Sequence, residues 1–207
     1  MAYIKRGSLH TYKRAVHPEY ALYNANHRFD TAAASPIGFT HTRYATTGAV
    51  NDTNAHPFVE ERPDKRYVYA HNGCISNHRK LGSYEVDSQA LGPLIVKHKV
   101  GKAHGSVGLV WVEQDADGEK LFVYRHAQRL RAYTYRSEAG DLFTVVASRK
   151  CILEPALGEP VAKHTLHDGV AYEIRPEGPV PAWSCHVEEA YNAYLNKGAA
   201  RKVYAGG

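Results

Sequence analysis

The sequence has few of the features that cross-link a protein or hold it in a membrane. Its 207 residues include three cysteines and one methionine, and the longest uncharged apolar stretch, Ser106 to Val112, is far too short to span a bilayer. The opening residues Met-Ala-Tyr-Ile-Lys-Arg lack the apolar core of a signal peptide. An odd number of widely spaced cysteines indicates reduced thiols rather than a disulfide framework. We therefore expect a cytoplasmic protein with no membrane partner.

The remaining composition is that of an ordinary globular chain. The hydrophobic share is 43% and the charged share 23%, which excludes a disordered protein, and the length suits one domain. The net charge of +5 is spread along the sequence rather than gathered in blocks. A basic protein that contacts nucleic acid through its termini is the weakest of our functional hypotheses, so we do not expect a nucleic-acid partner.

Alternating apolar and polar residues predict a protein rich in strands. Residues 37–43 read as a strand that ends at Arg43, and residues 67–71 as a strand that runs into Asn72-Gly73, a pair expected to turn the chain. Asp87 is expected to cap a helix that continues towards residue 99. An antiparallel meander is predicted from four further strands, at residues 106–113, 120–125, 130–136 and 142–147. Strands and helices in separate blocks indicate an α+β protein.

A division of the chain is predicted near its C-terminal end. Pro176, Pro179 and Pro181 indicate a break, and the expected division is a domain over residues 1–176 followed by a helix and basic tail over 177–207. Apolar and aromatic residues at helical spacing predict a helix over residues 187–195 within this tail.

Several polar residues at the predicted strand ends could carry chemistry. The planar guanidinium of Arg43 can pair with both oxygens of a carboxylate, although most arginines are simply surface cations. Asn72 and Gly73 could present a side-chain amide and a backbone N–H to one oxyanion, or could form an ordinary turn. Asp87 could bind an ammonium group or only cap its helix. Scattered histidines and cysteines form no paired zinc signature, so we expect no metal.

Taken together and in this order, four motifs resemble the class II glutamine amidotransferases, which belong to the N-terminal-nucleophile (Ntn) type and include the front domains of glucosamine-6-phosphate synthase and asparagine synthetase. The motifs are His41-Thr-Arg-Tyr-Ala-Thr46, Asn54-Ala-His-Pro57, His71-Asn-Gly73 and Glu85-Val-Asp87-Ser. Weaker agreement extends the resemblance over roughly residues 36–175. It implies an Ntn-hydrolase-like four-layer αββα sandwich, and no cofactor.

The resemblance also implies roles for the residues of these motifs. Arg43 would hold the α-carboxylate of L-glutamine and Asp87 its α-ammonium group. Asn72 and Gly73 would act in catalysis by stabilising the oxyanion formed when the side-chain amide is attacked. Thr46 and His56 match positions that shape the loop around the substrate.

One part of the family pattern is missing from this sequence. The family nucleophile is a cysteine at the mature N-terminus, whereas this chain begins Met-Ala-Tyr-Ile, so we expect an N-terminally truncated version of the fold. Cys74 follows the proposed oxyanion glycine, but we interpret it as a buried thiol. Two hypotheses follow. The first is an amidotransferase whose cysteine comes from a second polypeptide, an upstream exon or start, or an unusual substitute, and whose ammonia is released or passed to a separate synthase. The second is a pseudoenzyme that binds glutamine or a partner without chemistry.

Overall fold

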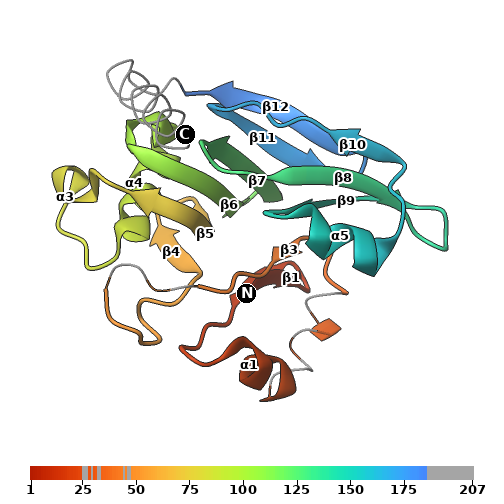
Figure 1. Cartoon of the computed structure of the whole chain (residues 1–207), viewed down its shortest axis with the longest axis horizontal. Coiled ribbons are helices and arrows are strands. Elements are labelled where there is room, and N and C mark those ends of the chain that lie inside the picture. Colours follow the sequence, from red (N-terminus) through yellow and green to blue (C-terminus); the bar gives the residue numbers. More distant parts are fainter. Residues whose placement is uncertain (25–27, 29, 32–33, 44, 46–47, 186–207) are drawn as a thin grey trace, which may run out of the picture.

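The computed structural model describes residues 1–24, 28, 30–31, 34–43, 45 and 48–185. This part of the chain consists mainly of antiparallel sheets, with short helices on the outer sides (Figure 1). None of the helices in the described ranges is long and apolar enough to cross a membrane.

The largest sheet has six strands in the spatial order β12-β11-β7-β6-β5-β4, and every neighbouring pair is antiparallel. The strands are β4 (Phe58–Glu61), β5 (Arg66–Ile75), β6 (Gly105–Asp115), β7 (Gly118–His126), β11 (Val170–Arg175) and β12 (Gly178–Ser184). In the central strand β6, Leu109 and Trp111 point to one face and Val112 to the other, and all three are buried. The sheet is therefore covered on both faces.

Short helical segments cover one of these faces. They are α3 (His78–Leu81), the 3₁₀ turns η1 (Asp87–Ala90) and η2 (Val100–Lys102), and α4 (Leu91–Val96) between the two turns. Leu91 and Ile95 have no exposed surface and pack with Trp111 and other residues of the six-stranded sheet. Pro93 lies in the first turn of α4, where its missing N–H has no helical partner to lose.

Two three-stranded sheets cover the opposite face. One has the order β2-β1-β3, with β1 (Ala2–Lys5), β2 (Ser8–Thr11) and β3 (Gly38–Phe39), and the other the order β10-β8-β9, with β8 (Arg131–Arg136), β9 (Leu142–Ala147) and β10 (Ala162–His164). Ile4 of the first sheet packs with Val68 and Val112 of the large sheet. Ala132 of the second packs with Val123 and Tyr172. The two small sheets thus share one layer.

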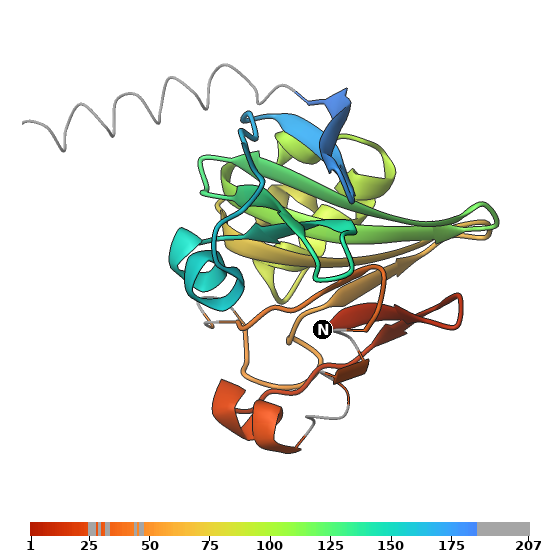
Figure 2. The same cartoon turned by 90° about the vertical axis from the view of Figure 1, so that its right-hand side faces the viewer.

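A fourth layer is formed by α5 (Lys150–Leu157). Its Leu153 packs on Tyr133 and Tyr135 of β8, on the side of that small sheet turned away from the six-stranded sheet. Figure 2 shows α5 beyond the small sheets, while α1 (Pro18–Asn24) lies below them in the view. The layer order is therefore α4 and its neighbours, the six-stranded sheet, the two small sheets, and α5. The predicted α+β class and four-layer αββα arrangement are confirmed.

The predicted strands are found, but their grouping differs from a single meander. β6 pairs with β7 and β8 pairs with β9, whereas β7 takes β11 as its second neighbour and β8 crosses to the other layer. Local alternation of apolar and polar residues identifies a strand. It does not say which sheet the strand joins, because that choice depends on the segments that pack against each face of the strand.

Two local expectations are wrong. Asn72 and Gly73 lie inside β5 and pair with Gly108 and Val107 of β6, so they do not turn the chain. The strand predicted at residues 37–43 is reduced to the two residues of β3. These two residues pair with Ala2 and Tyr3 of β1, and the pairing between the two strands extends no further.

The C-terminal part gives a mixed outcome. Residues 178–184 form β12, an edge strand where Pro179 and Pro181 are tolerated, although a break was predicted there. The helix predicted at residues 187–195 lies outside the described residues, and the division of the chain at residue 176 stays a prediction.

Candidate functional site

One cavity brings together five of the six predicted site residues. It has a volume of about 280 Å³ and is lined by His41, Thr42, Arg43, His56, His71, Asn72, Gly73, Asp87 and Ser88. These residues come from the segment after β3, the loop before β4, the C-terminal half of β5 and the start of η1. Of the predicted set, Arg43, His56, Asn72, Gly73 and Asp87 are therefore neighbours, while Thr46 lies outside the described residues.

Gly73 occupies a backbone position that requires glycine. Its φ is 145°, and a Cβ added there would lie 1.9 Å from the backbone oxygen of Ser106. A side chain cannot fit into this space without moving β6. The preceding Asn72 is exposed at the cavity and its carbonyl accepts a 3.5 Å hydrogen bond from the Gln128 side chain. The backbone of Asn72 and Gly73 is thus held in a paired strand.

Asp87 is buried beside the end of β5 and is only 4% exposed. One carboxylate oxygen accepts a 2.7 Å hydrogen bond from the N–H of Ile75, and the other a 2.9 Å bond from the N–H of Ser88. Asp87 begins η1 rather than capping it, since Val86 is the cap residue. A carboxylate can accept further hydrogen bonds beyond these two, so Asp87 retains acceptor capacity toward the cavity.

The loop before β4 is fastened to the η1 turn. Asn54, which has no exposed surface, donates a 2.7 Å hydrogen bond to the Glu85 carboxylate and a 3.1 Å bond to the carbonyl of Ala49. Glu85 lies two residues before Asp87, and Asn54 two residues before His56. The cavity wall that carries His56 is therefore tied to the turn that carries Asp87.

Two neutral imidazoles form part of the wall. Nδ1 of His41 and Nδ1 of His56 are 3.0 Å apart, and their rings meet edge to face with centroids 4.2 Å apart. Burial, together with the charge of His71, lowers the pKa of His41 to about 4. Burial, together with His41 and His71, lowers the pKa of His56 to about 2. Two cationic rings could not approach so closely. The short contact is therefore a hydrogen bond in which one Nδ1 carries the proton and the other accepts it.

A third imidazole, His71, is also buried, and desolvation lowers its pKa. It contacts the Ser88 hydroxyl at 2.9 Å and the Ser106 carbonyl at 3.1 Å. Sequence reasoning did not select the cavity residues His41, Thr42, His71 and Ser88. All four nevertheless stand inside or directly beside the motifs that carried the resemblance, which was the available signal.

Cys74 differs from its prediction as a buried thiol: its side chain is exposed. It follows Gly73 on β5, but it does not belong to the residues that line the cavity. Partial burial of the sulfur and the nearby charge of Asp87 both raise the pKa of the thiol. A raised pKa leaves less of the reactive thiolate near neutral pH.

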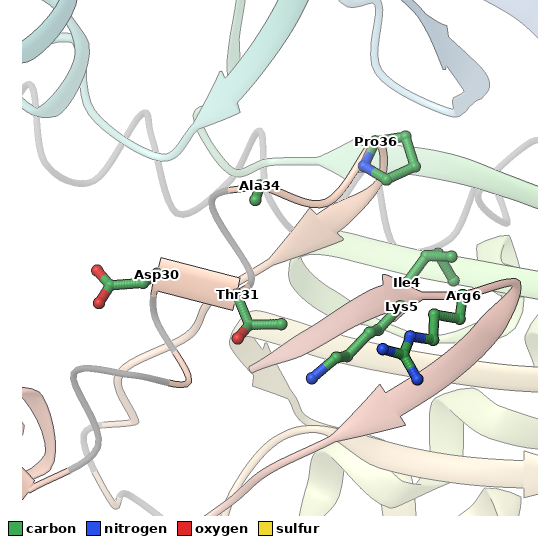
Figure 3. A pocket seen from close by; sticks show the side chains of 7 residues that line it. All are labelled: Ile4, Lys5, Arg6, Asp30, Thr31, Ala34 and Pro36. Carbon is green, nitrogen blue, oxygen red and sulfur yellow. The ribbon is translucent and has the colours of Figure 1, made fainter.

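A larger hollow of about 510 Å³ lies elsewhere, along the β1–β2 hairpin (Figure 3). Figure 3 shows the Asp30 carboxylate pointing away from Lys5 and Arg6, so these charges do not converge on a common point. None of the predicted site residues lines this hollow. We therefore take the smaller cavity as the candidate site.

The chemistry available in the smaller cavity follows from its lining. A guanidinium and a carboxylate can pair with the two charges of a free amino acid, and a side-chain amide next to a backbone N–H can stabilise an oxyanion. No cysteine stands among the described residues that line it.

The fold has a counterpart among solved structures. A structure described as the allosteric regulatory enzyme of purine biosynthesis superposes with a TM-score of 0.52 over 69% of this chain and 34% of that chain, at 19% identity. The αββα layers and this likeness define an Ntn-type fold.

The sequence matches are more specific. Residues 29–92 match the family described as class II glutamine amidotransferases. The human amidophosphoribosyltransferase is 31% identical over 150 residues, which are 71% of this chain and 23% of the relative. The glutamine–fructose-6-phosphate aminotransferase (isomerizing) of Staphylococcus aureus is 42% identical over 135 residues, 55% of this chain and 21% of the relative. The corresponding enzyme of Idiomarina loihiensis is 35% identical over 81 residues, 34% of this chain and 12% of the relative.

These matches identify a domain of the class II glutamine amidotransferase type in this chain. The chain spans less than a quarter of the length of each of these three relatives, with shares of 23%, 21% and 12%.

Proposed function

We propose that the cavity binds L-glutamine, and that the chain is the glutamine-recognising part of a class II glutamine amidotransferase. The observation that carries this proposal is that Arg43 and Asp87, which have opposite charges, line one cavity together with Asn72 and Gly73. The Arg43 guanidinium would pair with the α-carboxylate and the Asp87 carboxylate with the α-ammonium group. Thr46 and His56 would shape the wall around the ligand.

In the proposed reaction, a cysteine thiolate attacks the carbon of the glutamine side-chain amide. The C=O electron pair moves to oxygen, where the Asn72 amide and the Gly73 N–H stabilise the oxyanion. Collapse of this intermediate breaks the C–N bond, and the nitrogen leaves as ammonia after it takes up a proton. Water then hydrolyses the thioester, which yields glutamate and restores the thiol.

The described lining of the cavity supplies the recognition groups of this reaction but no thiol. We therefore propose that the cysteine comes from outside the described lining, from a second polypeptide or from another segment of the same protein, and that a separate synthase receives the ammonia. All three cysteines of this chain are free thiols, which supports a location in the reducing cytoplasm.

The alternative is a pseudoenzyme that binds glutamine, or docks to a partner, without chemistry. The absence of cysteine from the described cavity lining favours this alternative. Binding is common to both candidates, so it is tested first and turnover second.

Isothermal titration calorimetry with L-glutamine and L-glutamate tests recognition. We expect the Arg43→Ala variant to lose roughly tenfold or more in affinity, because removal of one partner of a charge-assisted pair costs about 2 kcal/mol or more. Arg79→Ala, which removes an exposed arginine of α3, is the matched control. Equal binding by Arg43→Ala and the parent would refute the carboxylate clamp.

Turnover is tested by ammonia release from glutamine and by labelling with an electrophilic glutamine analogue, with the chain alone and with the products of neighbouring genes. Ammonia and a cysteine adduct only in a mixture support the two-subunit enzyme. Binding with no ammonia and no adduct in any mixture supports the pseudoenzyme.

A further inference from the structure

The protonation state of His71 can be deduced from its two neighbours. Nε2 of His71 lies 3.1 Å from the backbone carbonyl of Ser106, and a carbonyl only accepts, so Nε2 carries a proton. The ring is 3% exposed and desolvation lowers its pKa, so it is neutral near pH 7 and its Nδ1 carries no proton. The Ser88 hydroxyl lies 2.9 Å from Nδ1 and 3.5 Å from an oxygen of Asp87, and an unprotonated Nδ1 at the shorter distance is the acceptor that we assign to it. This arrangement selects one tautomer.

The Ser106 carbonyl oxygen that is bonded to His71 also occupies the space beside the Cα of Gly73. A Cβ on Gly73 would lie 1.9 Å from this Ser106 oxygen and 2.8 Å from Nε2 of His71. The Ser106 hydroxyl also accepts a 3.2 Å hydrogen bond from the N–H of Cys74. Ser106 and the His71 ring therefore fix the backbone on one side of Gly73.

The η1 turn is attached to β5 on both sides of Gly73. Ser88 binds the ring of His71, two residues before Gly73, and the Asp87 carboxylate binds the N–H of Ile75, two residues after it. Ser88 and Asp87 are both 4% exposed, so water does not compete readily for these bonds.

We propose that His71 is a positioning residue for the Gly73 N–H: its Nε2–H holds the Ser106 carbonyl against Gly73, and the Ser88 hydroxyl keeps the imidazole in the tautomer that does so. That the Gly73 N–H serves as an oxyanion donor rests on the proposed function. The hydrogen-bonded arrangement itself does not, and it can be measured in the protein without ligand.

The first experiment is ¹⁵N NMR of the full chain at pH 7, which reports the protonation of each imidazole nitrogen and the chemical shift of each backbone amide. We expect His71 to be neutral with its proton on Nε2. Ser88→Ala removes the donor to Nδ1, so it should mix the two tautomers and shift the resonance of the Gly73 amide. Ser88→Thr, which keeps a hydroxyl, should restore both readings.

Matched variants separate positioning from general destabilisation. Ser76→Ala removes a hydroxyl bonded to the His104 carbonyl at the end of β5, so it should leave the His71 tautomer and the Gly73 amide unchanged. His71→Gln keeps a donor for Ser106, whereas His71→Phe does not, and only His71→Phe should shift the resonance of the Gly73 amide. A proton on Nδ1 of His71, or an unchanged Gly73 amide in both Ser88→Ala and His71→Phe, would overturn the proposal.

Glutamine titration then distinguishes this inference from the function on which it rests. We expect Ser88→Ala to weaken glutamine binding about three- to tenfold, as for one lost hydrogen bond. If the parent shows the predicted tautomer and amide shifts but does not bind glutamine, the proposed function is rejected and the positioning is kept. Binding of glutamine with the wrong tautomer would reject the positioning alone.

Discussion

The side-chain amide of Asn54 donates a 2.7 Å hydrogen bond to the carboxylate of Glu85, 31 residues further along the chain. This bond joins the loop that leads into His56 to the turn that begins at Asp87. Two parts of the cavity wall that are distant in sequence therefore move as one.

Asn54→Ala should lower both stability and ligand affinity. Loss of its hydrogen bonds to Glu85 and Ala49 should reduce the free energy of unfolding by about 1–3 kcal/mol, because Asn54 is completely buried. Urea denaturation and glutamine calorimetry measure the two effects. Asn77→Ala is the control, since Asn77 also bridges two loops, through Lys102 and His104, but does not line the cavity. Parental glutamine affinity in Asn54→Ala would contradict the proposed coupling.

Gly73→Ala should be among the most damaging small substitutions in the chain. The added Cβ would overlap the Ser106 oxygen and the residue would keep an unfavourable φ, so we expect a loss of about 3 kcal/mol or more in the free energy of unfolding. Gly140→Ala provides the comparison, because Gly140 also has a positive φ of 95° but open space around it. Its expected cost is about 1 kcal/mol. Similar melting temperatures for the two variants would show that the contact with Ser106 is unimportant.

Stability should fall as the pH drops below about 6.5. The pKa values of His41 and His56 are lowered in the folded protein to about 4 and about 2, from an ordinary value of 6.5. The unfolded chain therefore binds more protons below pH 6.5, and the free energy of unfolding decreases down to about pH 4 for His41 and further for His56. Between pH 7 and 5 we expect a loss of about 2 kcal/mol for each ring that stays neutral.

Urea denaturation across this range measures the slope. His41→Gln and His56→Gln should each flatten it, whatever they do to stability at pH 7. His17→Gln, which changes an exposed histidine outside the cavity, is the control variant. A parental slope in both cavity variants would mean that these rings are protonated in the folded state.

Cys74 should be accessible but slow to react. Its thiol is exposed, yet partial burial of the sulfur and the charge of Asp87 raise its pKa, so alkylation by iodoacetamide at pH 7 should be slower than that of an unhindered model thiol. Because Cys74 does not line the cavity, Cys74→Ser should bind glutamine as the parent does. Adduct formation at Cys74 by an electrophilic glutamine analogue, at a rate saturable with glutamine, would instead indicate that this thiol reaches the ligand.

The sequence was sufficient to predict most strands and five of the residues that gather at the cavity, and the family resemblance supplied the αββα layers. β6 reads as a nearly continuous apolar run because both faces of the sheet are buried, and polar residues at strand ends pointed to the site. Asn72-Gly73 was misjudged for a physical reason. An Asn-Gly pair signals a turn locally, but the close approach of Ser106, more than thirty residues away, holds it in a strand.

The contacts inside the site were beyond sequence reasoning. The pairing of His41 with His56 depends on how two loops meet, and that of His71 with Ser88 depends on how η1 sits on β5. A motif identifies such residues as members of a group, but their partners are decided by packing between distant segments. The exposure of Cys74 was missed because the face of β5 on which it lies was judged from a turn that does not exist.

The register of β5 with β6 runs unbroken from Arg66 opposite Gln114 to Ile75 opposite Gly105, and Asn72 and Gly73 lie within it. These two residues consequently belong to the same cooperative unit as the buried centre of the sheet. Displacement of the backbone at the cavity therefore disturbs the pairing of the two longest strands, β5 and β6. Whatever ligand enters meets donors whose placement was already determined when the protein folded.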